Sequence, residues 1–341
     1  MFGVEIPYWG QSILRSLAVA AAVLLPAGTA VYLYLFKMVS FMQSRLGPME
    51  AGPYGSMQLF AEVGKFLQKE DLHPENADRF IFKAAIFVVF LTVFLIYLAV
   101  PFGPFAVFAD YSTGIFFALA VSSISVLGIL MAGWSSANKY SLMGGLRAAG
   151  QLIAYELPMI LAVMGVVIQA GTLNMQGIVA AQHNGEIFGW GGIGNPYVFT
   201  QFLALVIFLI SAQAELTQTP FDMPVAESEL VAGYMTEYSG FRFLLFFIAE
   251  FASAGAFAAL AATLYLGGWA LPGIALDASY MNIIGPLVLF TKMLVLMALI
   301  FFIRFTYPRF REDQLQRFAW KFLIPIALIN IMVTACLKVA F

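Results

Sequence analysis

The 341-residue sequence predicts an all-α polytopic membrane protein with eight transmembrane helices and one amphipathic helix lying in the cytoplasmic interface. Hydrophobic residues make up 62% of the chain and charged residues only 11%, whereas roughly 25% of the residues of an average soluble domain are charged. A soluble globule of this length would need far more polar surface. The apolar stretches are continuous rather than alternating, which excludes a transmembrane β-barrel.

The spans are predicted by eight stretches that each approach the roughly 20 apolar residues needed to cross a bilayer. The first stretch is too long for a signal peptide, because it continues through Phe36. The predicted spans are residues 13–36, 80–100, 114–133, 150–170, 197–214, 241–266, 284–304 and 320–341. We expect them to form a single membrane domain over residues 1–341.

The distribution of Lys and Arg predicts the orientation. The loops 101–113, 171–196 and 267–283 contain neither residue. Fourteen of the seventeen basic residues lie in or beside the other loops, at Lys37, Arg45, Lys65, Lys69, Arg79, Lys83, Lys139, Arg147, Arg242, Arg304, Arg309, Arg311, Arg317 and Lys321. The positive-inside rule assigns these loops to the cytoplasm, and an even number of spans then places both termini outside.

Segment 57–69, between the first two spans, has the pattern of an interfacial helix. Its apolar residues recur at helical spacing, with polar residues opposite them, as in a helix that lies on a membrane without crossing it. The apolar face comprises Leu59, Phe60, Val63, Phe66 and Leu67, and the polar face Gln58, Glu62, Lys65 and Lys69. A short connector with chance periodicity is the alternative. Charged loops of this kind are typical of a docking face for a soluble partner.

Three ionisable residues fall inside predicted spans: Glu156, Glu250 and Lys292. Such residues cost about 2.5–3.5 kcal/mol each on insertion and are functional candidates by default. Burial disfavours the charged form of either group, so these side chains are candidates for proton exchange. The alternative is structural, in which one carboxylate pairs with Lys292 and holds two helices together.

The predicted cytoplasmic loop 215–240 is acidic and contains no Lys or Arg. Its acids are Glu215, Asp222, Glu227, Glu229 and Glu237, and apolar residues separate them. Asp222 and Pro224 suit the start of a helix in which Glu227 and Glu229 would point about 200° apart. Unpaired carboxylates among apolar groups have raised pKa values and share protons. The loop therefore predicts an acidic funnel into the bilayer rather than a simply solvated face.

Several kinds of chemistry are excluded. The near balance of 17 basic and 19 acidic residues argues against nucleic-acid binding. A single cysteine, Cys336, excludes a disulfide framework, a Cys-ligated zinc site and a self-contained iron–sulfur cluster. We expect no metal site in this chain, so any redox metal must lie in another one. The residues alone favour a proton-handling subunit of a larger assembly and leave a free-standing channel or transporter open.

Four segments carry a resemblance to a known family. Residues 214–240, AELTQTPFDMPVAESELVAGYMTEYSG, closely resemble the signature loop of the H-subunit family of bacterial NADH–quinone oxidoreductase (respiratory complex I), whose mitochondrial counterpart is NADH dehydrogenase subunit one. Further matches occur at 43–48 (QSRLGP), at 133–142 (GWSSANKYSL) and at 308–314 (PRFREDQ). The resemblance covers essentially the whole chain.

This resemblance implies an eight-helix subunit that joins a peripheral redox arm to a proton-pumping arm in the bacterial plasma (inner) membrane. The chain would form the membrane-side part of a quinone tunnel. Quinone is the implied substrate, and the iron–sulfur clusters belong to partner subunits. The implied partners are the peripheral-arm iron–sulfur and quinone-site subunits, and small membrane-arm subunits that lead to antiporter-like subunits. The enzyme would be a proton-translocating NADH:quinone oxidoreductase, with no redox catalysis by this chain alone.

The resemblance also implies roles for individual residues. The acids that match family positions proposed to carry charge are Glu156, Glu215, Asp222, Glu227, Glu229, Glu237 and Glu250, to which burial alone adds Lys292. Arg45, Lys65 and Arg242 fall in segments that border the tunnel. Tyr32, Tyr34 and Phe36, with Phe60 and Phe66, could line an entrance from lipid, and an ordinary aromatic belt is the alternative.

Two segments depart from the family pattern. Leu35-Phe36-Lys37 stands where the family usually has Glu-Arg, and Met49-Glu50-Ala51 replaces the usual Asn-Arg-Val. Both changes remove basic residues near the expected tunnel mouth. They leave the electron donor and the quinone species (ubiquinone or menaquinone) open. The alternatives are the equivalent anchor of a ferredoxin-, F420- or hydrogenase-linked complex, or an autonomous ion transporter.

Overall fold

The computed structural model describes residues 8–104, 106–185, 194–274, 276 and 280–340, and this part of the chain contains helices and loops but no strands. In chain order the helices are α1 (Tyr8–Thr29), π-helix η1 (Ala30–Met38), α2 (Val39–Met42), 3₁₀ turn η2 (Pro53–Gly55), α3 (Gln58–Gln68), α4 (Arg79–Ala99), α5 (Gly114–Ser135), α6 (Lys139–Ala170), α7 (Met175–Asn184), α8 (Tyr197–Thr200), α9 (Phe202–Glu215), α10 (Glu227–Leu230), 3₁₀ turn η3 (Gly233–Met235), α11 (Gly240–Tyr265), α12 (Met281–Thr306), α13 (Glu312–Phe318), π-helix η4 (Ala319–Leu323) and α14 (Ile324–Ala340).

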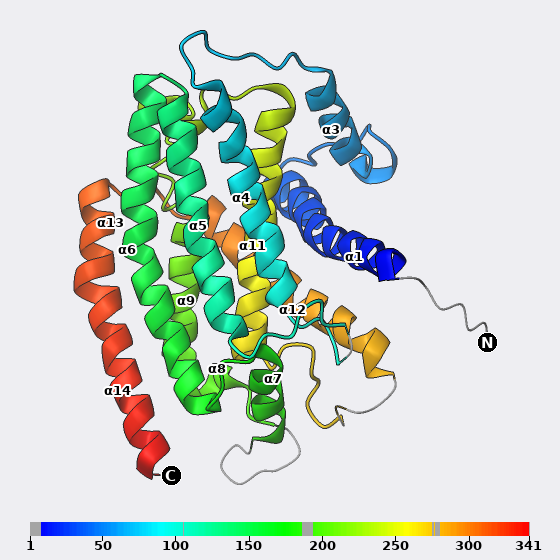
Figure 1. Cartoon of the computed structure of the whole chain (residues 1–341), viewed down its shortest axis with the longest axis vertical. Helices are drawn as coiled ribbons and strands as arrows, with labels where there is room; N and C mark the ends of the chain where they lie inside the picture. Colours follow the sequence, from blue (N-terminus) through cyan, green and yellow to red (C-terminus); the bar gives the residue numbers. More distant parts are fainter. Residues whose placement is uncertain (1–7, 105, 186–193, 275, 277–279, 341) are drawn as a thin grey trace, which may run out of the picture.

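Long apolar helices dominate the structure, which confirms the prediction of an all-α polytopic membrane protein. Seven helices in the described part are long and apolar enough to span a membrane: Ser16–Met42, Arg79–Ala99, Gly114–Ser135, Lys139–Ala170, Gly240–Tyr265, Met281–Thr306 and Glu312–Ala340. They run side by side in Figure 1, with α1 and α12 strongly inclined to the others. Their length and composition agree with a chain that crosses a bilayer several times.

The fifth predicted span is the exception in length. It is divided at Gln201, whose backbone (φ −119°, ψ 33°) is not helical, so that α8 has four residues and α9 has 14. At 1.5 Å per residue α9 is about 21 Å long, less than the roughly 30 Å hydrocarbon core of a bilayer. The Gln201 side chain explains how the break is stabilised, because it donates to Thr334 Oγ1 at 2.9 Å and accepts from Asn330 Nδ2 at 3.0 Å.

Small residues allow the helices and the acidic loop to pack closely. A Cβ atom on Gly133 of α5 would lie 3.1 Å from Gly145 Cα of α6. A Cβ on Gly144 would lie 2.6 Å from the backbone nitrogen of Tyr234, in the loop that precedes α11. Close approach at small residues is the usual mode of helix packing in membranes, where apolar burial drives association only weakly. Here it also brings the acidic loop against α6.

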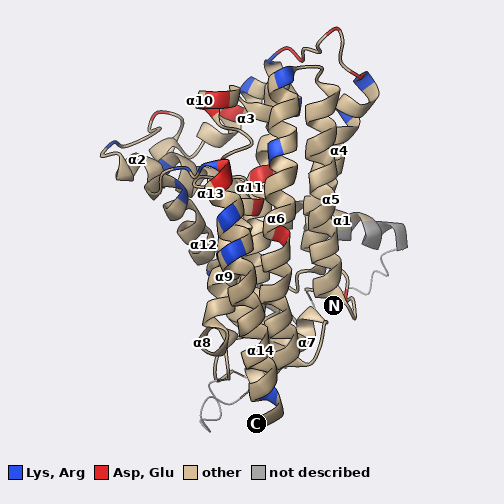
Figure 2. Cartoon of the chain, turned by 90° about the vertical axis from the view of Figure 1, so that its left-hand side faces the viewer, with Lys and Arg blue, Asp and Glu red and all other residues tan. Residues whose placement is uncertain are grey.

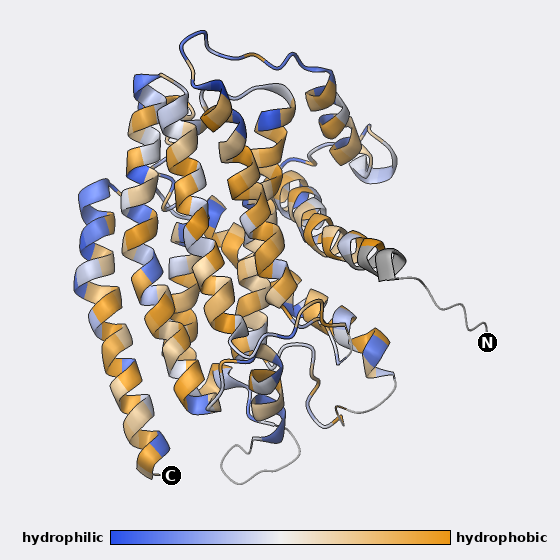
Figure 3. Cartoon of the chain, in the orientation of Figure 1, coloured by the Kyte–Doolittle hydropathy of each residue, from blue (hydrophilic) through white to orange (hydrophobic). Residues whose placement is uncertain are grey.

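The centre of the bundle is α11, in which every residue from 254 to 265 is buried. The amphipathic helix predicted over residues 57–69 is present as α3, and no residue of α3 is fully buried. It lies beside α1 at the end of the bundle where α4 begins (Figure 1). Most Lys, Arg, Asp and Glu residues gather in that half of the molecule (Figure 2), while the helices are mainly hydrophobic along their length (Figure 3).

Candidate functional site

An apolar cavity of about 800 Å³ lies between α3, the continuous helix formed by α1 and η1, and α11. Phe60, Val63 and Phe66 line it from α3, and Phe247 and Ile248 line it from α11. Among the described residues that line it, Glu62 is the one that carries a charge. The remaining lining residues are Leu24, Leu25, Ala27, Gly28, Thr29, Val31, Tyr32, Phe36, Leu59 and Leu244. A cavity of this size and character suits a long apolar ligand.

A second pocket, of about 350 Å³, adjoins the first at Phe66 and is more polar. Lys65 and Lys69 line it, together with the hydroxyl-bearing Thr236, Tyr238 and Ser239. Its other lining residues are Ala232, Met235, Gly240 and Phe243. The rings of Phe66 and Phe243 stand 5.6 Å apart at the boundary. Lys65 also forms an ion pair with Glu62, so it links the polar pocket to the apolar cavity.

Arg45 and Arg242, both expected at the tunnel, line neither cavity. Arg242 forms an ion pair with Asp71 at 3.0 Å, and its guanidinium carbon lies 5.5 Å from the centre of the Phe82 ring. It therefore joins the 69–78 connection to the start of α11. Arg45 is exposed and donates to Gln43 Oε1 at 2.8 Å.

The acidic loop contains less helix than the sequence suggested. The continuous helix expected from Asp222 is absent, and the loop forms the single turn α10 and the 3₁₀ turn η3 instead. The backbone limits the helix on both sides: Ala226 (φ −53°, ψ 99°) is not helical, and Val231, with a positive φ of 66°, ends α10. Buried apolar side chains hold the loop in place instead, at Phe221, Met223, Ala226 and Leu230.

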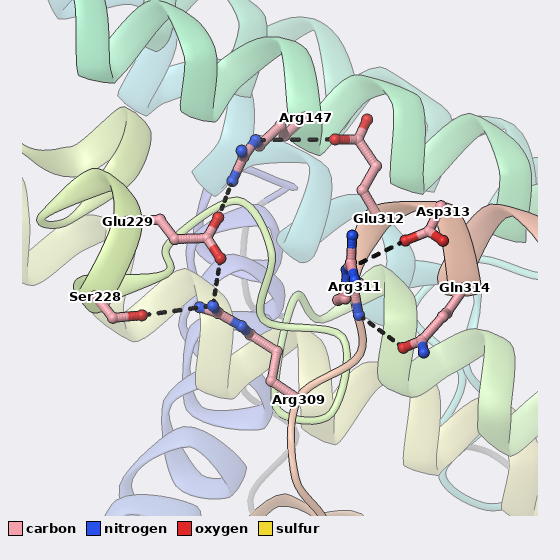
Figure 4. Close-up of polar contacts among 8 residues, drawn as sticks. All are labelled: Arg147, Ser228, Glu229, Arg309, Arg311, Glu312, Asp313 and Gln314. Carbon is pink, nitrogen blue, oxygen red and sulfur yellow. Dashed lines mark hydrogen bonds and ion pairs between the residues drawn. The ribbon is translucent and has the colours of Figure 1, made fainter.

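Glu229 is ion-paired, which contradicts the expectation that the acids of the loop are unpaired. Its two carboxylate oxygens accept from Arg147 and from Arg309, each at 2.6 Å (Figure 4). Arg147 also lies 4.0 Å from Glu312. The hydrogen bond from Arg147 holds the pKa of Glu229 below its usual value. Glu229 thus anchors the loop between α6 and the segment that follows α12.

Asp222 is half-buried in an open pocket of about 560 Å³. Burial raises the pKa of Asp222 to about 6, and the Glu250 carboxylate acts in the same direction. Arg304 and Arg309 act in the opposite direction. Asp222 can therefore change protonation near neutral pH. The other residues that line the pocket are Thr219, Glu227, Ser228 and Arg309.

Glu250, on α11, pairs with Arg304 of α12 at 3.2 Å. The same oxygen, Oε1, accepts from Gln218 Nε2 at 3.3 Å. The Arg304 guanidinium carbon lies 5.8 Å from the centre of the Phe251 ring. A half-buried carboxylate is thereby held between a cation and an amide donor, and it interacts electrostatically with Asp222 in the adjoining pocket.

Glu156 and Glu215 form a second acidic group, between α6 and the end of α9. The Ser123 hydroxyl donates to Glu156. Oε2 of Glu215 is buried and has no hydrogen-bond partner among the described residues. The two carboxyl groups interact electrostatically. Glu237 stands apart from them and accepts from the Asn138 side-chain amide.

Lys292 contacts neither carboxylate that the sequence offered as a structural partner. Its ammonium group donates to the backbone oxygens of Leu266 and Gly268, both at 2.7 Å, and of Ala270 at 2.9 Å. These carbonyls follow the C-terminal end of α11. A cation at this position satisfies carbonyls of the segment that follows the helix and opposes the negative end of the helix dipole.

We expect Lys292→Met to destabilise the protein, because it leaves buried carbonyls unpaired at a cost of about 1–3 kcal/mol. The measurement is the yield and thermal inactivation of the detergent-solubilised assembly. Lys338→Met is the matched control, because Lys338 binds one exposed carbonyl, that of Gln169, at 2.6 Å. Normal stability combined with lost proton transfer would instead support the proton-coupling role predicted from the sequence.

The sequence drew attention to the acids and missed their partners. Arg147, Arg304, Arg309, Gln218 and Ser123 all bind predicted site residues. Arg304 gave a signal in retrospect, because it is an arginine in the last turn of an apolar helix. For Gln218 and Ser123 the sequence offered no signal, since isolated amides and hydroxyls are common in membrane helices and loops.

Comparison with known proteins gives concordant matches. A family described as NADH dehydrogenase matches residues 14–335. The H subunit of the NADH-quinone oxidoreductase of Brevibacillus brevis is 41% identical over 333 residues, which cover 97% of this chain and 95% of that protein. The proteins of the same name from Bacillus thuringiensis and Bacillus cereus are each 44% identical over 307 residues, 89% of this chain and 87% of theirs.

Proposed function

The chain belongs to the NADH dehydrogenase family, and from this membership we propose that it is the membrane subunit that couples quinone reduction to proton translocation in an NADH–quinone oxidoreductase. One observation carries the proposal. The apolar cavity and the acid Glu250 share one helix, because α11 lines the cavity with Phe247 and Ile248 and carries Glu250 within a turn of them. Glu250 in turn interacts electrostatically with Asp222 in the acidic loop.

The two adjoining pockets support quinone as the ligand. A quinone has a long apolar tail and a small polar head that accepts protons. The 800 Å³ cavity matches the tail, and the smaller pocket offers the ammonium groups of Lys65 and Lys69 to the head. The hydroxyls of Thr236, Tyr238 and Ser239 already donate to the backbone oxygens of Gly233, Phe82 and Glu70. In this arrangement Phe60 and Lys65 belong to the tunnel, whereas Arg45 and Arg242 support its mouth through the surrounding loops.

The acids support proton transfer in two groups. Asp222 and Glu250 form the first, beside an open pocket, and Glu215 and Glu156 form the second, deeper between α6 and α9. Carboxyl groups that share a poorly solvated region exchange protons readily, because only part of the group can be charged at one time. The exposed Glu227 and the half-buried Glu237 extend this set, and Glu229 holds its loop in place.

The electron chemistry belongs to partner subunits. We propose that peripheral-arm subunits with iron–sulfur clusters bind at the end of the bundle that carries α3 and the acidic loop, where the charged residues gather (Figure 2). We propose that the membrane is a plasma membrane. The positive-inside rule then makes this end of the bundle cytoplasmic and places both termini outside. Small membrane-arm subunits leading to antiporter-like subunits would adjoin the bundle laterally.

The test is purification of the assembly through an affinity tag on this chain. We expect iron–sulfur subunits to co-purify and the assembly to reduce quinone with NADH. Membranes that lack the chain should lose this activity and regain it on complementation. A nickel–iron subunit without quinone reduction, or ion transport by the chain reconstituted alone, would contradict the proposal.

A further inference from the structure

Three buried glutamines surround the segment that connects α9 to Asp222. Gln151, Gln213 and Gln218 are 0%, 2% and 1% exposed, respectively. They come from α6, from α9 and from the connecting segment itself. Burying an amide group is costly unless it is hydrogen-bonded, so each of these side chains needs a reason to lie there.

The donor side of each amide has a partner. Gln151 Nε2 donates to the backbone oxygens of Ala214 and Phe221, both at 2.7 Å. Gln213 Nε2 donates to the Thr219 carbonyl at 2.8 Å, and Gln218 Nε2 donates to Glu250. The partners determine which side-chain atom is the nitrogen in each glutamine, because flipping the amide would place its oxygen against an acceptor oxygen.

The bonds close the segment into a defined shape. Gln151 joins Ala214 to Phe221, seven residues later, and Asp222 directly follows Phe221. Gln213 fixes the backbone at Thr219 between them. The remaining glutamine, Gln218, projects from the closed segment to Glu250 on α11. Together with the buried side chains of Phe221 and Met223, three amide groups that do not titrate therefore set the position of Asp222 relative to Glu250.

The acceptor side of each amide is unpaired. The Oε1 atoms of Gln151, Gln213 and Gln218 are buried without a donor among the described residues, as is Oε2 of Glu215. Ala214, whose carbonyl binds Gln151, immediately precedes Glu215. A proton on Glu215, or a water molecule, is the kind of donor that such oxygens require.

We propose that Gln151, Gln213 and Gln218 are positioning residues for proton transfer: they hold residues 214–222 so that Asp222 stands beside Glu250 and Gln218 bonds to Glu250. This glutamine clamp rests on the proposed function and adds residues to it that carry no charge. It explains why amides, rather than apolar side chains of similar size, occupy fully buried positions around the segment that follows α9.

The test uses the assembled complex in proteoliposomes with Gln218→Met or Gln151→Met, which keep length and remove the donors. NADH oxidation by a soluble acceptor upstream of quinone measures the amount of complex, and quinone-linked proton translocation is divided by it. We expect this normalised translocation to fall about fivefold, which corresponds to about 1 kcal/mol, a typical net contribution of a hydrogen bond. Gln201→Met is the control, because Gln201 is an equally buried amide outside the clamp.

A merely structural role would lower the amount of complex and leave the normalised translocation unchanged. That result, or failure of both variants to assemble while Gln201→Met assembles, overturns the clamp. Glu250→Gln separates the clamp from the proposed function. If it reduces translocation while the glutamine variants match the control, only the clamp is wrong. If Glu250→Gln pumps normally, Glu250 is not on the proton route, and the part of the proposed function that assigns it there is wrong as well.

Discussion

Replacing Val63 by Trp is expected to slow quinone reduction by the assembled complex about tenfold or more, the equivalent of about 1.4 kcal/mol in the barrier. Val63 lines the apolar cavity from α3, and α11 lines the same cavity. An indole ring at this position fills space that a quinone tail would occupy. The measurement is NADH-driven reduction of a long-tailed quinone, compared with electron transfer to a soluble upstream acceptor.

Ala61→Trp is the matched control for this substitution. Ala61 lies on the same helix, is exposed and does not line the cavity. We expect it to leave quinone reduction near the wild-type rate. A Val63→Trp complex that reduces long-tailed quinones normally would show that the cavity is not the route of the tail. A rise in KM for long-tailed but not for short-tailed quinones would be the sharpest support.

Replacing Glu250 by Gln is expected to reduce quinone-linked proton translocation about tenfold or more. Glutamine has nearly the same size and still accepts from Arg304 and Gln218, so the local packing is preserved while the proton-binding group is lost. Translocation is measured in proteoliposomes and normalised to upstream electron transfer. Asp313→Asn is the control, because Asp313 is exposed and pairs only with Arg311 among the described residues. Normal translocation in Glu250→Gln would remove this carboxyl group from the route.

The helices could be predicted from the sequence because the requirement for about 20 apolar residues acts on each stretch separately. The amphipathic helix α3 could be predicted equally well, because the spacing of its own apolar and polar residues defines its two faces. The break at Gln201 was not, because the side chains that stabilise it, Asn330 and Thr334, lie about 130 residues away. Local patterns fix local structure, and this break depends on a distant contact.

The candidate site shows the same division. The sequence identified the acids because burying a charged group in an apolar setting costs free energy. The structure shows which acids are ion-paired, and this pairing determines which of them can exchange protons. Glu229 carries no sign in its own segment of Arg147 and Arg309, which reach it from about 80 residues before and after. The sequence suggested a carboxylate as the partner of Lys292, yet its ammonium group donates to three backbone carbonyls beyond α11. Charge balance along the chain does not reveal which charges meet.

Redox-induced infrared difference spectroscopy of the assembled complex would test most directly whether carboxyl groups of this chain change protonation when quinone is reduced in an adjoining protein. We predict a change in the carbonyl-stretch bands of protonated carboxyl groups on reduction by NADH. This change should be diminished in Glu250→Gln and in Asp222→Asn and unaltered in Asp313→Asn. An identical spectrum in the wild type and all three variants would contradict the proposed coupling.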